Sequence, residues 1–150
     1  MELNDKIFIT APMAQVYEAL NDPEVLKACI PGCEELIKHS NTELEAKVVS
    51  KVGPVKAKFT GNVTLDQSGA PDQFSLTGKG NGGAAGYAKG GAVVELEKHL
   101  DGTLLHYTAT ADIGGKLAQL GSRLIQGTSK KLATKFFKSF ADLVGEDDAA

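Results

Sequence analysis

The residues best suited to chemistry in this chain of 150 residues are two cysteines and a run of glycines. Cys29 and Cys33 have C-x-x-x-C spacing, with Pro31 and Gly32 between them. Two thiolates would supply half of a tetrahedral zinc site, but the chain has no second cysteine pair. The nearest imidazole, His39, follows on an expected strand. Structural thiols near a helix end are therefore favoured over a redox or metal site, and we assign no metal site.

The glycine run GKGNGGAAGYAKG contains a nucleotide-like pattern. Gly78, Gly80 and Gly83 have the G-x-G-x-x-G spacing that places a dinucleotide pyrophosphate at a helix N-terminus. That motif works only between a strand and the helix that it opens. Here the following residues, YAKGGAVVELE, alternate between polar and apolar and lack a helical period. The pattern indicates a strand and argues against a nucleotide site.

The three histidines, His39, His99 and His106, are scattered over different strands or turns. No serine or cysteine nucleophile stands in a recognisable elbow beside a histidine, and no carboxylate pair is placed for acid–base work. We assign no catalytic residue and favour a protein that is not an enzyme, although the question stays open at this point.

Composition restricts the class of protein. The length suits one domain, and 42% hydrophobic with 23% charged residues is ordinary for a globular chain. A net charge of −3 argues against nucleic acid as a partner. No segment approaches the roughly 20 apolar residues of a membrane span. The N-terminus, MELNDKIFIT, lacks the features of a signal peptide. We expect a cytoplasmic protein with reduced thiols.

Hydrophobic periodicity predicts a sheet followed by one long helix. A first strand covers 2–10, a short helix begins at Pro12, and a second covers 23–29 with Asp22 as its N-cap. A helix of about 28 residues starts at the Gly114–Gly115 pair, with Gly121 and Gly127 inside it. Between them, period-two alternation predicts antiparallel strands over 42–52, 55–65, 73–80, 86–98 and 103–113. We expect one domain, 1–145, and a short acidic tail, 146–150.

The expected inward faces of three neighbouring strands are large at one end and nearly bare at the other. Large residues give way to small ones at these positions: Phe74 and Leu76 to Gly78 and Gly80; Val94 and Leu96 to Ala92, Gly90 and Ala88; Leu105 and Tyr107 to Ala109 and Ala111. Because interiors are densely packed, something must fill this space. Either the long helix sits closer there, or a cavity accepts an apolar guest; the cavity is favoured.

Four segments give the chain a family resemblance: LNDPEVLKACIPGCEEL, KVGPVKAKFTG, GKGNGGAAGYAKGGAVVEL and IGGKLAQLGSRLIQGTSKKLATKFF. Over about residues 2–140 the chain resembles the CoxG family of carbon monoxide dehydrogenase subunits. The resemblance implies an α+β helix-grip fold of the START-like (SRPBCC) superfamily, in which a curved antiparallel sheet wraps around a long C-terminal helix over a hydrophobic cavity. It also implies service to a molybdenum hydroxylase such as carbon monoxide dehydrogenase, through membrane recruitment or delivery of a lipid-like, quinone-type ligand.

Some members of that family carry a C-terminal apolar anchor, whereas this chain ends in VGEDDAA. We therefore expect a soluble carrier, or a peripheral contact at the inner face of the membrane. No covalent cofactor is expected, only a bound quinone or lipid. The residues expected to line the cavity are Ile30, Pro31, Phe59, Phe74, Leu76, Tyr87, Ala88, Tyr107, Leu117, Leu120 and Leu124. Tyr87 belongs there only if the glycines shift the strand register.

Two alternatives to a non-catalytic ligand carrier remain. One is an interaction or assembly factor with a filled core, which docks the dehydrogenase through basic residues of its C-terminal helix. Those residues, which form a solvated face in the favoured interpretation, are Lys116, Arg123, Lys130, Lys131, Lys135 and Lys138. The other is an enzyme of the cyclase or hydratase kind, which START-like folds also host; it would need a titratable group in the cavity.

Overall fold

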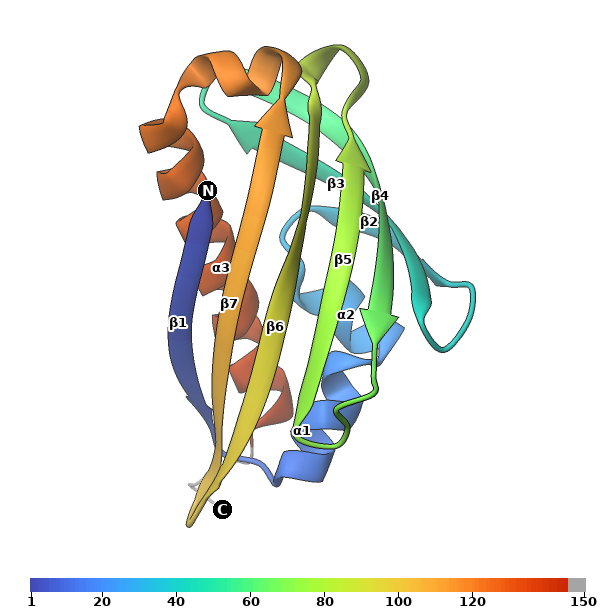
Figure 1. Cartoon of the computed structure of the whole chain (residues 1–150), viewed down its shortest axis with the longest axis vertical. Coiled ribbons are helices and arrows are strands. Elements are labelled where there is room, and N and C mark those ends of the chain that lie inside the picture. Colours follow the sequence, from blue (N-terminus) through green and yellow to red (C-terminus); the bar gives the residue numbers. More distant parts are fainter. Residues whose placement is uncertain (146–150) are drawn as a thin grey trace.

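The computed structural model describes residues 1–145, whose strands form one curved antiparallel sheet (Figure 1). The strand order is β1-β7-β6-β5-β4-β3-β2, so β1 pairs with the last strand and the others follow as consecutive hairpins. The strands are β1 (Glu2–Ile9), β2 (Cys33–Lys38), β3 (Glu43–Val52), β4 (Val55–Asp66), β5 (Gln73–Asn81), β6 (Tyr87–His99) and β7 (Gly102–Gly114). The expected acidic tail, 146–150, lies outside the described residues.

The helices lie on one side of the sheet. They are α1 (Met13–Leu20), α2 (Pro23–Cys29) and α3 (Ser122–Val144), with short 3-10 helices η1 (Gly83–Ala85) and η2 (Gly115–Leu120). As expected, Asp22 caps α2: its carboxylate accepts a hydrogen bond from the backbone N–H of Glu24 at 2.9 Å, and Pro23 takes the first helical position. The predicted architecture, a curved antiparallel sheet with two short helices after the first strand and a long C-terminal helix, is confirmed (Figure 1).

The long helix starts later than predicted. Residues from Gly115 form η2, and Gly121, with φ of +93°, separates η2 from α3. A residue with a side chain would be strained in this left-handed region, so glycine permits the break. The prediction that Gly121 lies inside the helix is therefore wrong. Gly127 does lie inside α3, but a Cβ there would meet no atom within 4 Å, so it mediates no close approach.

The sequence pattern does not predict the bounds of strand β2. Its residues, CEELIK, do not alternate cleanly between polar and apolar, and the strand is an edge strand paired only with β3. A register shift between Cys33 and Glu35 further breaks the alternation. His39, which we expected on a strand, follows directly after β2.

The packed core fills the end of the sheet that α1 and α2 cover, at the bottom of Figure 1. Phe140 of α3 is fully buried there, and Phe137 stacks on Tyr107 with ring centroids 4.7 Å apart. Thr103 is also fully buried, and its hydroxyl donates a hydrogen bond to the Ala11 carbonyl at 2.8 Å. Large side chains from the sheet and the C-terminal half of α3 thus fill this end.

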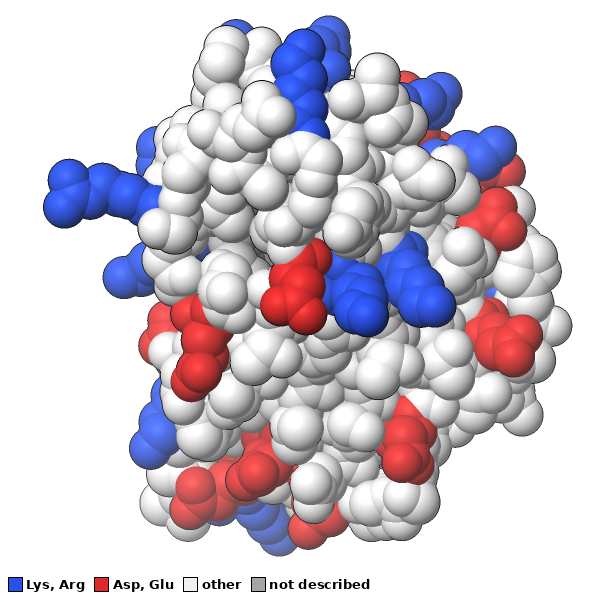
Figure 2. Space-filling model, turned by 45° about the horizontal axis from the view of Figure 1, so that its top comes forward, with Lys and Arg blue, Asp and Glu red and all other residues white. Residues whose placement is uncertain are grey.

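Charged side chains are divided unevenly over the surface. In Figure 2, which brings the top of Figure 1 forward, Lys and Arg lie mainly over the upper half and Asp and Glu mainly over the lower half. Of the helices in residues 1–145, none combines the length and the apolar character needed to cross a bilayer.

Candidate functional site

The inward face of the sheet changes from large to small side chains toward the end opposite the core. Cross-strand pairing confirms the predicted gradient, because it joins the relevant residues in rows. In the core, one row is Phe74–Val94–Tyr107. Toward the other end, the rows become Val63–Gly78–Gly90–Ala111 and Gly61–Gly80–Ala88–Ile113. The sheet therefore contributes little side-chain volume at that end.

A cavity of about 320 Å³ occupies this space, between the sheet, η2 and the N-terminal half of α3. It is open to solvent, and most of its lining residues are partly exposed although they face inward. The lining consists of Ile30, Pro31, Val48, Ser50, Val52, Phe59, Gly80, Ala88, Ile113, Leu117, Ile125, Thr128, Ser129 and Leu132. The polar side chains in this set are the hydroxyls of one serine on β3 and of a serine and a threonine on α3. None of these described lining residues has an ionisable side chain, so the cavity suits an uncharged, mainly apolar guest.

Two glycines beside the cavity leave room for the large side chains of Phe59 and Leu124. The ring of Phe59 lies directly against Gly82, where a Cβ would collide with it. Gly53, in the β3–β4 turn with φ of +58°, is in contact with the side chain of Leu124 at the start of α3. The β3–β4 turn thus meets α3 beside the cavity.

The G-x-G-x-x-G spacing falls on a hairpin connection. Gly78 and Gly80 belong to β5, Gly83 begins the single turn η1, and the chain then enters β6. Gly86 has φ of +121° and packs so closely on the backbone of Gly114 that a Cβ would overlap it. The predicted strand after the glycines is confirmed, and these glycines shape a turn and the cavity wall.

Five of the eleven expected lining residues come together around the cavity. They are Ile30 and Pro31 in the α2–β2 turn, Phe59 on β4, Ala88 on β6 and Leu117 in η2.

Three of the others lie in or against the packed core. Phe74 and Tyr107 are buried there, and Leu76 packs against the same cluster. Their strands are the expected ones and their faces point inward, but they lie at the end of the sheet that the aromatic half of α3 fills.

The remaining three lie outside the lining. Tyr87 points to the outer face and is 54% exposed, because Ala88 pairs with Gly80 without any register shift. Leu120 ends η2, and Leu124 is 37% exposed against the β3–β4 turn. The break at Gly121 changes which residues of α3 point toward the sheet. Ile125 therefore lines the cavity, whereas Leu124 does not.

Nine lining residues were absent from the expected set. Four of them, Val48, Ser50, Val52 and Gly80, lie on faces that the alternation assigned inward, and Ile113 continues the inward series of β7. The other four are on α3: Ile125, Thr128, Ser129 and Leu132. The alternation could have identified the sheet residues, whereas the helix residues required knowledge of the break at Gly121.

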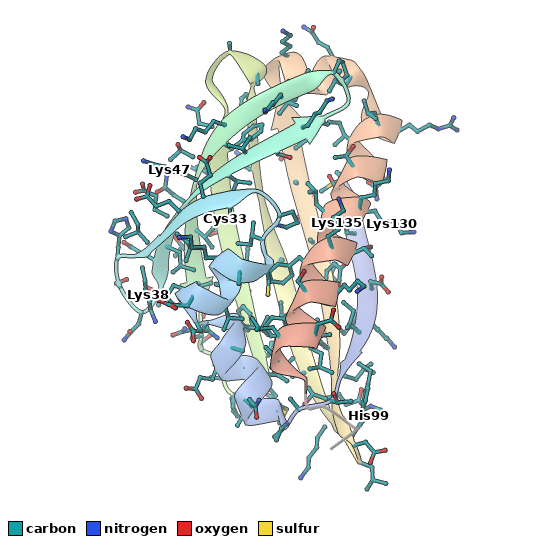
Figure 3. The ribbon with its side chains drawn as sticks, turned by 180° about the vertical axis from the view of Figure 1, so that it is seen from behind. Cys33, Lys38, Lys47, His99, Lys130 and Lys135 are labelled. Carbon is teal, nitrogen blue, oxygen red and sulfur yellow. The ribbon has the colours of Figure 1, made fainter. Side chains whose placement is uncertain are left out.

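The cysteines lie beside the cavity, and both are free thiols. Cys29 is 3% exposed, and Cys33, labelled in Figure 3, donates a weak hydrogen bond to the Glu35 carbonyl at 3.4 Å. Burial raises the pKa of both thiols, and for Cys33 this outweighs the lowering of the pKa by the backbone of Glu35 and by the positive charge of Lys27. Within residues 1–145, no group of His, Cys, Asp and Glu side chains could hold a metal ion. Protonated thiols near a helix end match the structural interpretation.

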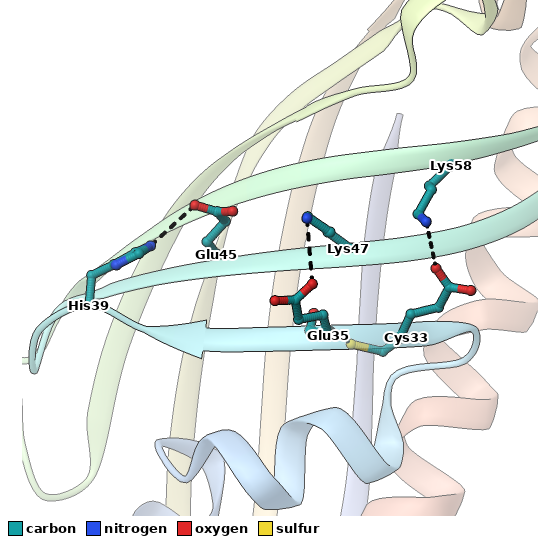
Figure 4. Close-up of polar contacts among 7 residues, drawn as sticks. Cys33, Glu35, His39, Glu45, Lys47 and Lys58 are labelled. Atoms are coloured by element: carbon teal, nitrogen blue, oxygen red, sulfur yellow. Dashed lines mark hydrogen bonds and ion pairs between the residues drawn. The ribbon is translucent and has the colours of Figure 1, made fainter.

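Polar contacts on the outer face tie β2 to the rest of the sheet (Figure 4). His39 lies 3.2 Å from Glu45, measured from Nε2 to Oε1. Two further ion pairs join β2 to β3 and β4: Lys47–Glu35 at 3.5 Å and Lys58–Glu34 at 3.0 Å. These exposed contacts lie on the opposite side of the sheet from the cavity, so they bear on the stability of the edge strand.

Comparison with known proteins places this geometry in a family. No match was found among curated proteins. A conserved protein from Geobacillus kaustophilus shares 29% identity over 96% of this chain and 95% of its own, with a TM-score of 0.89. A START superfamily protein from Mycobacterium smegmatis is 10% identical (95% and 96% covered, TM-score 0.74), and a STAR-related lipid transfer protein from Xanthomonas axonopodis is 17% identical (95% and 85% covered, TM-score 0.65). The fold is therefore START-like. Since the model of the CoxG family of carbon monoxide dehydrogenase subunits matches residues 6–145, the chain belongs to that family.

Proposed function

We propose that this protein is a non-catalytic accessory of a molybdenum hydroxylase such as carbon monoxide dehydrogenase, and that it holds a lipid-like molecule in its cavity. The observation that supports this most directly is the apolar cavity of about 320 Å³, within the size range of small-molecule sites. Membership of the CoxG family and the START-like fold support the same function. The accessory would recruit the enzyme to the membrane or deliver its electron acceptor.

A quinone suits the chemistry of the lining. Its ring is flat and apolar, and its two carbonyl oxygens accept hydrogen bonds at opposite ends of the ring. Ser50 lies on the sheet wall, whereas Thr128 and Ser129 lie on the helix wall, so donors are available from both walls. A quinone lying between sheet and helix would find hydrogen bonds for both oxygens without burying a charge.

The cyclase or hydratase alternative is less well supported. Such chemistry needs a titratable group that touches the substrate. The described lining offers hydroxyls only, and Tyr87 and Tyr107, which the sequence had suggested, lie outside the cavity. The cavity also favours a carrier over a docking protein with a filled core.

The test is to fill the cavity from the sheet side. Ala88→Phe places a ring in the open space, so we expect a folded protein that no longer takes up a quinone. The probes are menadione and decylubiquinone, and their binding is measured by calorimetry. Val93→Phe is the matched control, because Val93 lies on the outer face of the same strand and is 38% exposed. Uptake by Ala88→Phe equal to that of the parent would exclude this cavity as the binding site.

Native mass spectrometry of protein purified from its own host adds an independent test. A quinone or lipid that is released on unfolding would identify the guest. A mass without any guest, together with no uptake of either probe, would favour the docking protein with a filled core.

A further inference from the structure

Positive charge is concentrated in three segments of the chain. Residues 46–65, 73–94 and 113–141 together contain twelve Lys and Arg residues and no Asp or Glu. The rest of the chain contains four lysines and all nineteen acidic residues. Although the net charge of the protein is −3, all the charged residues in these three segments are therefore Lys or Arg.

The fold brings the turns of these segments to one end of the molecule. The β3–β4 turn, the η1 connection and η2 all lie at the top of Figure 1, at the end of the sheet that holds the cavity. Six exposed cations surround this end, and we call them the basic end: Lys51, Lys56, Lys79, Lys89, Lys116 and Arg123. α3 extends the positive charge along its exposed side through Lys130 and Lys135 (Figure 3).

The cations of the basic end are available to an outside partner. None of the six forms an ion pair with another described residue, whereas Lys47 and Lys58 are paired with glutamates of β2. Asp112, which lies opposite Lys89 on the outer face of the sheet, offsets one of the six charges. A net positive surface remains, as the upper half of Figure 2 shows.

Apolar side chains are exposed at the same end. Tyr87, 54% exposed, stands two residues before Lys89 on β6 and pairs with Asn81 of β5, the strand that carries Lys79. Leu124, 37% exposed, follows Arg123. Tyrosine favours the boundary between lipid headgroups and hydrocarbon, and cations favour the headgroup layer of an anionic membrane. Cations without an ion pair in residues 1–145 thus stand beside exposed apolar side chains, and this combination matches a lipid surface better than an acidic protein surface.

We propose that the basic end docks on an anionic lipid bilayer. The cavity end of the molecule then faces the membrane, and the end that holds the packed core faces away from it. Four of its cations are chain neighbours of cavity residues: Lys51 stands between Ser50 and Val52, Lys79 precedes Gly80, Lys89 follows Ala88 and Lys116 precedes Leu117. Docking in this orientation would place the cavity next to the apolar phase in which a lipid-like ligand dissolves. The purpose of docking rests on the proposed function; the docking itself is tested without any ligand.

Vesicle binding tests the surface. We expect the protein to sediment with vesicles of one part phosphatidylglycerol to two parts phosphatidylcholine, not with phosphatidylcholine alone, and to be released by salt. Each cation near an anionic surface contributes about fivefold to binding, so Lys51→Gln with Lys56→Gln should weaken it about 25-fold. The matched control, Lys6→Gln with Lys98→Gln, removes the same charge from outside the three segments and should bind as the parent does. Equal losses in both double variants would overturn the proposal, because net charge alone would then explain binding.

The orientation can be tested because the chain contains no tryptophan. Tyr87→Trp puts a reporter at the basic end, and Leu100→Trp puts one at the fully exposed β6–β7 turn at the opposite end. On adding the anionic vesicles, only the emission of Tyr87→Trp should shift to the blue. A shift of Leu100→Trp instead, or of both variants equally, would overturn the orientation.

Failure of this proposal is distinguishable from failure of the proposed function. If the parent takes up menadione but ignores anionic vesicles, the cavity function stands and the membrane surface does not. If it ignores vesicles and binds an acidic partner protein through Lys51 and Lys56, the basic end is a protein interface and the membrane proposal is wrong. If it binds vesicles but no quinone, the docking surface stands alone.

Discussion

Replacing Phe59 and Phe140 by alanine, one at a time, compares the two halves of the interior. Phe140 is 0% exposed, and its ring stacks on that of Phe136 with the ring centroids 6.0 Å apart. Its truncation removes a fully buried ring and leaves a new void in the packed core. Such changes cost about 3–5 kcal/mol, a large share of the roughly 5–15 kcal/mol that stabilises an ordinary domain.

Phe59 should be much less costly to truncate. Its ring already borders the cavity and is partly exposed, so shortening it extends an existing space and creates no closed void. Burying a phenylalanine side chain completely is worth about 1.5–3 kcal/mol, and only part of that is lost here. We therefore expect Phe59→Ala to lower the free energy of unfolding by about 1–2 kcal/mol.

Urea unfolding followed by circular dichroism measures both changes, provided that the dependence on urea concentration stays the same in parent and variants. Phe74→Ala is a useful control, because Phe74 is 3% exposed and should behave like Phe140. If Phe59→Ala costs as much as Phe140→Ala, the wall around Phe59 is packed as tightly as the core in solution. The cavity, and the function argued from it, would then be wrong.

Four further predictions concern single polar groups. Thr103→Val removes the buried hydrogen bond to the Ala11 carbonyl and should lower the free energy of unfolding by about 1–3 kcal/mol in urea; no change would show that the bond is absent in solution. Tyr17→Phe should leave that free energy unchanged or raise it, since the Tyr17 hydroxyl is buried without a partner. Burial raises the pKa of Tyr17 and Tyr107, so stability that is present below about pH 10 should fall as the pH rises further, and Tyr107→Phe should flatten that fall in urea titrations. Cys33, whose thiol pKa is raised by burial, should react with iodoacetamide near pH 8 more slowly than free cysteine and faster as the pH rises; a rate equal to that of free cysteine, by mass spectrometry, would contradict this.

Local signals predicted much of the fold. The start of α2 follows from Asp22 and Pro23, which act through contacts within one helical turn. The pairing of β3 with β4 follows from uninterrupted alternation on both sides of the turn at Gly53. By contrast, the break at Gly121 depends on how η2 and α3 meet the sheet, and a glycine inside a helical pattern gives no sign of it.

The candidate site shows a similar limit. Alternation states which face of a strand points inward, and it placed both Ala88 and Phe74 on the correct face. It does not state which end of that face the helix fills. The aromatic half of α3, with Phe140 at its centre, packs over the Phe74 end, so the open space remains at the Ala88 end. That distinction depends on contacts between residues far apart in the sequence.

The separation of a packed end from an open end has a consequence for protein engineering. Because fully buried residues such as Phe140 and Leu105 stabilise the fold, the positions around the cavity contribute less to its stability. Substitutions at the partly exposed Val48, Val52 or Leu132 can then change the shape of the space at modest cost in stability. The scaffold is suited to redesign for guests of other shapes, with the stabilising half kept constant and only the walls of the open half exchanged.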